Sequence, residues 1–407
     1  MPRPRRYRPG VAWEGRATIS VATLPGQGVY ARHLGHPEGV DAVYRPTVGL
    51  AGRSMPGASF TPTWLRAHLD EADVVHVHAL RSGQDPAQVS AAVEVVRASG
   101  TPLVVTGYHL RDPSGGDPQA YAAQLDALIP YADAVVTLTH TAATEIRHRW
   151  GLNAIVVPHP HVVDFVRMHR KRLPRRGPLR VGAHLANLQV GQDPVLLIQA
   201  LTRAAAAVDD TRLVILAHET VLDPGSSCYA PAAVREIHRL VRAGGGTLRT
   251  HRPFTDSQLW DHLSSVDISL LPDLHGSHSI WPEACTDLGT QPLIPACTHA
   301  AAQQPCLTYH PHSCAEALAD ALATALLTAH EKQTIAPVDP QRRWAERVRG
   351  AETLRALYER LLGQPAGGRP TPGPISTTPD QAPKRHVPPG DQYLPRRRQG
   401  SERASGS

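Results

Sequence analysis

The stretch LLPDLHGSHSIWPEACTDLGTQPLIP, which covers residues 270–295, is the most informative part of the sequence for the fold. It predicts a strand over residues 267–271, a loop of small residues over 276–279, a short helix opened by Pro282 and Glu283, and then a second strand. At such a junction the free N–H groups and the positive end of the helix face one point, and both favour an anion. The stretch therefore predicts a site for a phosphorylated ligand.

The first turn of this predicted helix carries two informative residues. Proline suits the position of Pro282, because the N–H group that it lacks would have no partner there. The carboxylate of Glu283 is placed to accept two hydroxyl hydrogen bonds, as from a ribose. The alternative is an ordinary connection between a helix and a strand, in which the negative charge of Glu283 only interacts favourably with the positive end of the helix dipole. Local chemistry leaves both readings open.

The composition is that of a globular chain. Its 407 residues suffice for two domains, and its hydrophobic content of 41% is close to the globular norm. No apolar run approaches the ~18 residues of a membrane span. Residues 1–10 are basic but have no apolar segment behind them, so we do not expect a secretory signal.

The cysteines indicate the redox compartment. There are five of them, an odd number, and none has the C-x-x-C spacing of a zinc site. This pattern favours a reducing cytoplasm over a disulfide-bonded setting. The five residues are Cys228, Cys285, Cys297, Cys306 and Cys314.

The positive charge is concentrated at the two ends of the chain. The formal net charge is +6, yet Arg3, Arg5, Arg6 and Arg8 alone contribute +4, and residues 364–407 contribute another +4. The remaining body is therefore close to −2. A basic face that binds nucleic acid has little support from this distribution, and we expect no nucleic acid partner.

Residues 17–163 are predicted to form a first domain, after a disordered basic segment over residues 1–16. Apolar segments of strand length alternate in it with helical stripes, which indicates a parallel sheet covered on both faces. The helical stripes include Val89 to Val96, stopped by Gly100, and Ile146 to Trp150, closed by Gly151. The predicted strands cover residues 18–24, 74–78, 103–106, 134–138 and 155–157.

A charged linker over residues 164–178 separates this domain from a second one over residues 179–340. Thr255 and Gln258 form a capping box that opens a helix. The predicted strands of the second domain cover residues 179–183, 213–217, 247–250, 268–271 and 292–294. The Arg-rich part of the linker, residues 167–176, is expected to be a solvated hinge, with an acidic acceptor or a membrane surface as the alternative partner.

The end of the chain contains a helix and a tail. A last helix over residues 341–363 turns Val348, Leu354, Leu357 and Leu361 inward. Residues 364–407 contain nine prolines together with Gly, Ser and Arg, cannot bury a core, and are expected to be disordered.

Polar residues follow many of the predicted strands. In two open, doubly wound α/β domains, ligands bind outside the carboxyl ends of the strands, in a cleft where the two sheets face each other. We therefore expect that site to be lined by residues of both domains. The residues in question are Gly26, Gly28, His78, His109, Thr139, Asn187, His218 and 275–279.

Several of these segments together resemble the GT-B fold glycosyltransferases of family 4, which retain anomeric configuration. DVVHVH at 73–78 is similar to their second strand, and 132–160 is similar to the strand, helix and strand before their linker. HGSHSIWPEACTDLGT, residues 275–290, resembles the donor-site signature, in which two glutamates flank seven residues. With VYARHL at 29–34 it looks like an actinobacterial subgroup. The resemblance implies two Rossmann-like domains facing a cleft.

The resemblance also implies roles for individual residues. Glu283 matches the glutamate that holds the nucleotide ribose, His275 stands where the other signature glutamate contacts the donor sugar, and His109 matches a histidine near the reacting carbon. The implied catalytic residues are thus His109 and His275. The implied donor-binding residues are Gly26, Gly28, His184, Asn187, Gly276, Ser277, His278, Ser279, Ile280 and Glu283.

The chain departs from the family where phosphate charge must be neutralised. The family places an Arg and a Lys after the first strand of its second domain, and here Asn187 and Gln192 stand there. Loss of two cations at a leaving diphosphate removes several kcal/mol of transition-state stabilisation, roughly. Arg32, His184 and His278 are the candidate replacements.

The implied activity is transfer of a sugar from a nucleotide-sugar donor to an unidentified acceptor, with no obligatory metal or other cofactor. Two alternatives remain. The first is a catalytically weakened protein that binds a nucleotide sugar as an accessory subunit. The second is a metal-dependent hydrolase, because three H-x-H pairs can each turn two imidazoles to one side of a strand. These pairs are His76/His78, His159/His161 and His310/His312.

Overall fold

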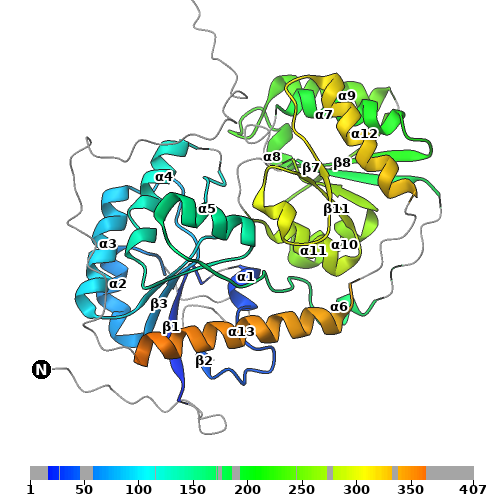
Figure 1. The fold of residues 1–407 in the computed structure, drawn as a ribbon. Coiled ribbons are helices and arrows are strands. Elements are labelled where there is room, and N and C mark those ends of the chain that lie inside the picture. The colour runs from blue at the N-terminus through cyan, green and yellow to red at the C-terminus, as the bar shows by residue number, and fades with distance from the viewer. Residues whose placement is uncertain are drawn as a thin grey trace, which may run out of the picture. The chain divides into compact units, whose positions relative to one another are not determined.

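The computed structural model describes residues 17–26, 28–45, 58–114, 116–170, 172, 177–185, 193–243, 245–272, 278–331 and 338–363. They fold into two parallel sheets, each with helices on both faces, within one compact unit (Figure 1). The predicted disorder of residues 1–16 and 364–407 concerns segments outside the described residues.

The first sheet has six parallel strands in the order β2-β1-β3-β4-β5-β6. The chain order reverses between β1 and β3, which makes this pair the topological switch point. The strands are β1 (Ile19–Leu24), β2 (Val43–Tyr44), β3 (Val74–Val77), β4 (Leu103–Thr106), β5 (Ala134–Thr137) and β6 (Ile155–Val156).

The first sheet and the helices that cover it form the first lobe, and the second sheet with its helices forms the second lobe. Residues at the helix ends set the bounds of the first-lobe helices. Thr139 caps the start of α5 by accepting a hydrogen bond from the Ala142 N–H, and Gly151 ends it in the left-handed conformation at φ 69°. Gly100 ends α3 in the same way at φ 75°. The helices are α1 (Val29–Arg32), α2 (Pro62–His68), α3 (Pro86–Ser99), α4 (Pro118–Asp126) and α5 (His140–Trp150).

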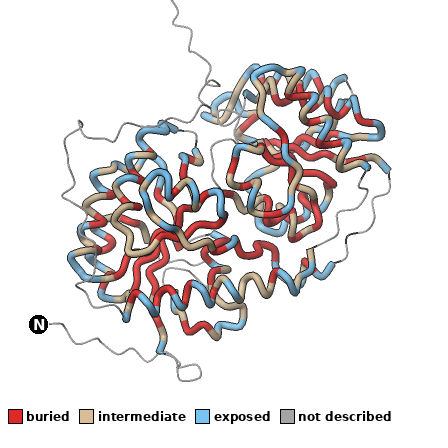
Figure 2. The backbone as a smooth tube through the Cα atoms, in the orientation of Figure 1, coloured by how far each residue is buried: buried red, intermediate tan, exposed pale blue. Residues whose placement is uncertain are grey.

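Both faces of the first sheet are covered. Residues of α2, α3 and α4 form a buried apolar cluster on one face. The other face packs against α13 (Pro340–Gly363), which contributes Leu354, Leu357 and Tyr358. Figure 2 shows the strands buried and the outer sides of the helices exposed. The strands are therefore nearly continuous apolar runs, as expected for a parallel sheet.

The second sheet also has six parallel strands, in the order β12-β11-β10-β7-β8-β9. Its chain order reverses between β7 and β10. The strands are β7 (Leu179–Leu185), β8 (Thr211–His218), β9 (Thr247–His251), β10 (Ile268–Leu270), β11 (Gln291–Pro295) and β12 (Leu307–Tyr309).

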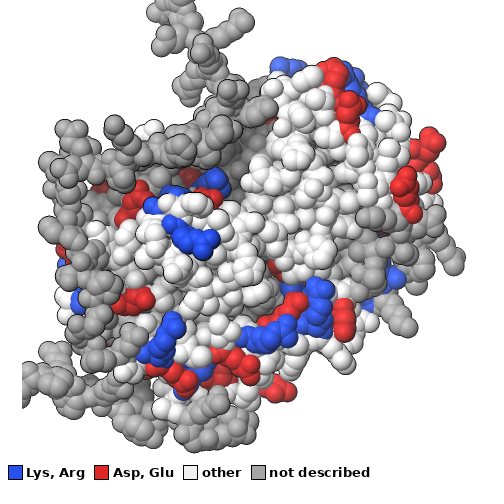
Figure 3. Space-filling view, viewed as in Figure 1, with Lys and Arg blue, Asp and Glu red and all other residues white. Residues whose placement is uncertain are grey.

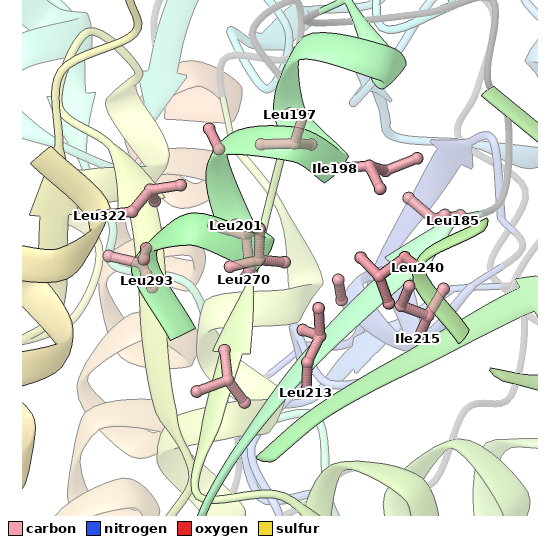
Figure 4. Close-up of a cluster of buried hydrophobic side chains, with 14 of the residues drawn as sticks. Leu185, Leu197, Ile198, Leu201, Leu213, Ile215, Leu240, Leu270, Leu293 and Leu322 are labelled. Atoms are coloured by element: carbon pink, nitrogen blue, oxygen red, sulfur yellow. The ribbon is translucent and has the colours of Figure 1, made fainter. Parts of the chain in front are cut away.

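A leucine-rich core joins this sheet to its helices. Leu213 and Leu270 from the strands, Leu201 from α7 and Leu322 from α12 are at most 2% exposed (Figure 4). The helices are α7 (Pro194–Ala206), α8 (Glu219–Leu222), α9 (Pro231–Arg242), α10 (Asp256–Ser265), α11 (Ile280–Leu288) and α12 (Ala315–Glu331). None of the helices in the described ranges combines the length and the apolar character that a membrane crossing requires.

The ten strands expected from the sequence are all present, with ends that differ by at most two residues. The sequence missed β2 and β12, which are short edge strands, and it missed α7, α9 and α12. The capping box of Thr255 and Gln258 is confirmed at the start of α10. The short helix of the opening stretch begins at Ile280 rather than Pro282, because the Ser279 hydroxyl caps it by accepting from the Trp281 N–H.

The linker is less solvated than expected. It contains the short helix α6 (Phe165–Met168), and Arg167 from that helix pairs with Asp261 of α10. Arg172 is mostly buried; its Nη1 donates to Thr290 Oγ1 at 2.7 Å and its Nη2 lies 3.2 Å from Asp267 Oδ1. The expectation of a solvated hinge is thus wrong for these two arginines, because carboxylates of the second lobe bind them.

Candidate functional site

The first switch point places Gly26 and Gly28 directly after β1 and ahead of α1. Gly28 has φ 99°, a backbone conformation that side chains strain, while a Cβ there would meet no atom within 4 Å. The glycine is thus required by its backbone angle rather than by close packing. Because the turn leads into α1, it sets the position of Tyr30 at the carboxyl edge of the first sheet.

A buried group of rings lies at this edge. The Tyr30 ring is 5.4 Å from that of His78, 5.0 Å from that of Tyr108 and 4.9 Å from that of His159. His159 Nδ1 donates to the Pro160 carbonyl at 2.7 Å, so its Nε2 accepts from the Tyr108 hydroxyl at 3.2 Å. Burial lowers the pKa of His78 and of His159 to about 3. Both imidazoles are therefore neutral at pH 7.

His109, the predicted catalytic residue, lies two residues after Gly107 in the loop that follows β4. It is partly exposed, and its ring is 4.7 Å from that of Tyr108. With His78 and Thr106 it lines a cavity of about 10 Å³, the space of a single water molecule. The residue therefore lies at the carboxyl edge of the first sheet, as the sequence predicted, and its catalytic role stays a prediction.

The carboxyl edge of the second sheet gathers histidines from three adjacent strands. His184 precedes the last residue of β7, His218 ends β8 and His251 ends β9. His184 Nε2 lies 3.1 Å from His251 Nε2, and the rings of His218 and His251 are 5.3 Å apart. The His184 ring also stacks on that of Trp281 in α11, with 4.9 Å between centroids and 17° between planes.

Hydrogen-bond partners fix the tautomers of these three rings. His251 Nδ1 lies 2.6 Å from the Arg252 carbonyl, so Nδ1 carries the hydrogen and Nε2 accepts from His184 Nε2. The Nδ1 atom of His184 therefore has a lone pair. Thr220 N donates to His218 Nδ1 at 3.3 Å, which leaves the hydrogen of His218 on Nε2. Burial, and then the His251 ring, lower the pKa of His184 to about 3.

Only part of the donor-site signature lies in the described residues. His275, Gly276 and Ser277 fall outside them, as do Asn187 and Gln192. Their predicted roles are therefore untested.

The described start of α11 is partly capped by the protein itself. Ser279 N donates to Gln303 Oε1 at 2.8 Å, and Trp281 N donates to Ser279 Oγ at 3.1 Å. Ile280 opens the helix and packs against the cluster that contains Cys285.

Glu283 is fully buried, and its carboxylate is bonded to protein side chains. Oε1 accepts from Gln303 Nε2 at 2.9 Å, and Oε2 accepts from Gln304 Nε2 at 2.9 Å and from Arg343 Nη2 at 2.5 Å. Burial raises the pKa of Glu283 to about 7, against the opposing effect of the Arg343 charge. The described geometry gives Glu283 a structural task, because it holds α13 onto α11. Contact with a ribose remains a prediction that requires these bonds to rearrange.

Asp287, one turn further along α11, joins the same network. Its Oδ1 accepts from Arg343 Nε at 2.8 Å, and its Oδ2 accepts from the N–H groups of Val162 at 2.8 Å and Val163 at 3.1 Å. The network therefore ties the second lobe to the segment that leaves the first. No local pattern distinguishes Arg343, because it lies 60 residues from Glu283 on a helix that carries several arginines.

Two of the candidate replacement cations already have protein partners. Arg32 Nη2 pairs with Asp256 Oδ2 at 3.0 Å. His278 is 2% exposed, with Nδ1 at 2.7 Å from the Tyr108 carbonyl and Nε2 at 3.0 Å from Thr139 Oγ1. Burial lowers the pKa of His278 to about 3. His184 is neutral at pH 7 as well, because burial lowers its pKa to about 3, so in the described geometry it does not supply the missing positive charge either.

Two of the three H-x-H pairs, His76/His78 and His159/His161, are engaged in hydrogen bonds. His76 Nδ1 lies 2.7 Å from the Tyr358 hydroxyl and His76 Nε2 lies 2.8 Å from Thr106 Oγ1. His161 Nδ1 lies 2.7 Å from the Val163 carbonyl. Within the described ranges, no group of three His, Cys, Asp or Glu side chains is arranged to hold a metal ion. The hydrolase alternative therefore lacks a ligand set in this part of the chain.

Charges on the face drawn in Figure 3 are of both signs. Lys and Arg lie interspersed with Asp and Glu over the described residues of that face. Ion pairs also form along α13, such as Arg342 with Glu346 at 3.1 Å and Arg355 with Glu359 at 2.8 Å.

The architecture has counterparts among solved structures, although no protein-family model and no curated protein matches the sequence. Sucrose-phosphate synthase from Thermosynechococcus elongatus matches with a TM-score of 0.53 and 15% identity, over 85% of this chain and 99% of its own. A glycosyltransferase from Rickettsia africae ESF-5 matches with a TM-score of 0.54 and 10% identity, over 86% and 100%. The fold is GT-B.

A third match shares this GT-B fold but is named for a different reaction. It is the putative UDP-N-acetylglucosamine 2-epimerase from Listeria monocytogenes, with a TM-score of 0.52 and 15% identity over 84% of this chain and 98% of its own. At these identities the likeness concerns the fold, so activity must be argued from the residues at the carboxyl edges of the two sheets.

Proposed function

We propose that this GT-B protein transfers a sugar from a nucleotide-sugar donor to an acceptor, with retention of anomeric configuration. The observation that carries the proposal is the placement of the chemistry-bearing residues at the carboxyl edges of both sheets. Gly28 and His109 lie at the carboxyl edge of the first sheet, and His184 and Trp281 lie at that of the second. Ligands of doubly wound sheets bind at these edges.

The similar structures support a nucleotide sugar as the ligand class. They are named as a glycosyltransferase, a sucrose-phosphate synthase and a putative UDP-N-acetylglucosamine 2-epimerase. The last name states a nucleotide sugar as the substrate. The resemblance of residues 275–290 to a donor-site signature points to the same class.

The mechanism that fits these residues needs no nucleophilic carboxylate. In a retaining transfer of this type the acceptor hydroxyl approaches on the face from which the diphosphate leaves, and the leaving phosphate takes its proton. The protein then supplies position and charge stabilisation. His109 is the residue we assign to the sugar, and the residues before α11 are those we assign to the diphosphate.

The experiment is a panel of UDP-, GDP- and TDP-sugars, offered to the purified full-length protein with pooled sugar acceptors, with released nucleotide as the readout. We expect release with one donor class, lowered at least about tenfold in His109→Ala, since positioned groups of this kind contribute factors of this size or more. His238→Ala, an exposed change on α9, is the matched control. Absence of release with every donor contradicts the proposal.

Glu283 needs a separate variant because it also holds Arg343. Glu283→Gln keeps the size of the side chain, whereas Glu283→Ala would leave a cavity and remove the carboxylate that Arg343 Nη2 contacts inside the protein. Weaker donor binding by Glu283→Gln, at an unchanged thermal midpoint, supports contact with the ribose. Undiminished nucleotide release would leave Glu283 with the structural task alone.

An accessory subunit that binds a nucleotide sugar without transfer is the second candidate. Two observations favour it: Glu283 is sealed by Gln303, Gln304 and Arg343, and Arg32 is paired with Asp256. Calorimetry with the same nucleotide sugars separates the two candidates. Donor binding without release under any acceptor identifies the accessory role.

A further inference from the structure

His278 connects the two lobes at the start of the donor-site helix. It directly precedes Ser279, the N-cap of α11, and it is 2% exposed. Both of its ring nitrogens reach the first lobe: Nδ1 lies 2.7 Å from the Tyr108 carbonyl, and Nε2 lies 3.0 Å from Thr139 Oγ1. The ring is thus enclosed by residues that follow β4 and β5.

These contacts define one hydrogen-bond pattern. A carbonyl only accepts, so His278 Nδ1 carries the hydrogen and donates to Tyr108. The neutral ring then accepts at Nε2 from the Thr139 hydroxyl. Thr139 Oγ1 at the same time accepts from the Ala142 N–H at 3.3 Å, as the N-cap of α5. One imidazole therefore joins the beginning of α11 to the beginning of α5 and to the loop after β4.

The bond between His278 and the Tyr108 carbonyl lies next to His109, the side chain predicted to be catalytic. Tyr108 precedes His109 in the chain, and their rings are 4.7 Å apart in an edge-to-face arrangement. The Tyr108 ring is also 6.0 Å from that of His278. The backbone that carries His109 is thus bonded to the residue that precedes the N-cap of α11.

A second bond between the lobes supports this one. His299 Nδ1 lies 2.8 Å from Thr141 Oγ1, and His299 Nε2 lies 2.9 Å from Glu145 Oε2 in α5. Unlike His278, this contact includes a carboxylate, and its parts are only partly buried. Contacts at η4 (His299–Ala302) therefore hold α5 in place, while His278 contacts the loop of His109 itself.

We propose that His278 is a positioning residue, which fixes the distance between the donor phosphates ahead of α11 and His109 through its bonds to Tyr108 and Thr139. This inference rests on the proposed function. It assigns His278 a task other than the neutralisation of phosphate charge, because neither ring nitrogen is available to an anion. Positioning of reacting groups is steeply dependent on distance, and a misplacement of about 1 Å can cost about 100-fold in rate.

The test compares turnover with nucleotide binding in three variants of the full-length protein. His278→Ala removes both bonds, His278→Asn keeps an amide donor toward Tyr108, and Thr139→Ser keeps the hydroxyl. We expect kcat to fall about 10- to 100-fold in His278→Ala, while KM for the donor and Kd for the free nucleotide change less than about threefold. His278→Asn should recover part of kcat, and Thr139→Ser most of it.

The control is His238→Ala, which changes an exposed histidine on α9. Thermal unfolding of each variant separates loss of fold from loss of position, and His278→Asn serves as the test if His278→Ala does not fold. Wild-type kcat in a folded His278→Ala, or equal losses in affinity and kcat, overturns the positioning role. No nucleotide release by the unsubstituted protein contradicts instead the proposed function on which it rests.

Discussion

The carboxyl edges of the two sheets carry the same residue type in different surroundings. On the first sheet His76, His78 and His159 are at most 4% exposed. Both ring nitrogens of His76 and His159, and Nδ1 of His78, meet hydroxyls and carbonyls of the protein. On the second sheet His184 and His251 are partly exposed and bond each other. The first set fills a core, while the second presents ring nitrogens at an edge where ligands bind.

The difference shows that position in a strand does not decide what a histidine does. Both sets lie in or just after strands of parallel sheets. In the first lobe α13 and Tyr358 cover the rings, and burial lowers the pKa of His76 well below its ordinary value. In the second lobe the described neighbours of His184 are Trp281, Phe254 and other histidines, which leave part of the ring accessible.

The largest expected effect is a loss of folding stability in acid, which comes from the buried histidines of the first sheet. Folded-state pKa values of about 3 for His78 and His159 lie below the ordinary value of 6.5, so the unfolded chain binds more protons between these two limits. Stability is therefore fully present above about pH 6.5 and falls as the pH drops through this window, by up to ~1.4 kcal/mol per pH unit for each histidine.

Urea denaturation at pH 7.5, 6.5, 5.5 and 4.5 measures this slope. His159→Gln keeps a polar side chain that does not titrate, so it should flatten the dependence by the contribution of one histidine. A pH dependence that is the same in His159→Gln and in the unsubstituted protein would show that His159 is not a neutral, sealed group.

Alanine substitutions of one histidine from each set should differ in stability. His76→Ala leaves a cavity and removes the partner of the Tyr358 hydroxyl, so we expect a loss of roughly 2–4 kcal/mol. His184→Ala removes a partly exposed ring and should cost less than ~1 kcal/mol. Chemical denaturation at pH 7.5 measures the free energy of unfolding of both variants. Equal losses would mean that the two edges are equally sealed.

The smallest expected effect concerns ligand affinity in the second lobe. His184→Phe keeps an aromatic ring on Trp281 but removes the lone pair at Nδ1 and the hydrogen bond to His251. We expect weaker binding of the preferred nucleoside diphosphate by about threefold to tenfold, at most ~1.4 kcal/mol. Isothermal calorimetry measures it, with His78→Phe as the matched change in the first lobe where it folds. Unchanged affinity would remove His184 from the donor site.

Much of the fold was readable because its signals are local. Gly100 and Gly151 mark helix ends through the left-handed backbone that they adopt, and the capping box of Thr255 and Gln258 marks a helix start. The two edge strands, β2 and β12, were missed because they are two and three residues long and carry no clear pattern.

The site was only partly readable, since its partners come from far along the chain. The signature predicted that residues 278–283 stand at a strand-to-helix junction, and they do. It could not predict that Gln303, Gln304 and Arg343 would surround Glu283. Nor could it predict that the Tyr108 carbonyl would accept a hydrogen bond from His278. Such contacts depend on which surfaces face each other after the sheets have formed.

Two doubly wound sheets and the junction that begins α11 follow from the sequence alone, because capping residues and the alternation of apolar strands with amphipathic helices act over a few residues. The tertiary structure decided which histidines are sealed and which are accessible, and it gave Glu283 and His278 protein partners 60 and 170 residues away. The physical reason is that burial and hydrogen-bond partners, which set charge state and availability, are properties of packed surfaces rather than of residue type.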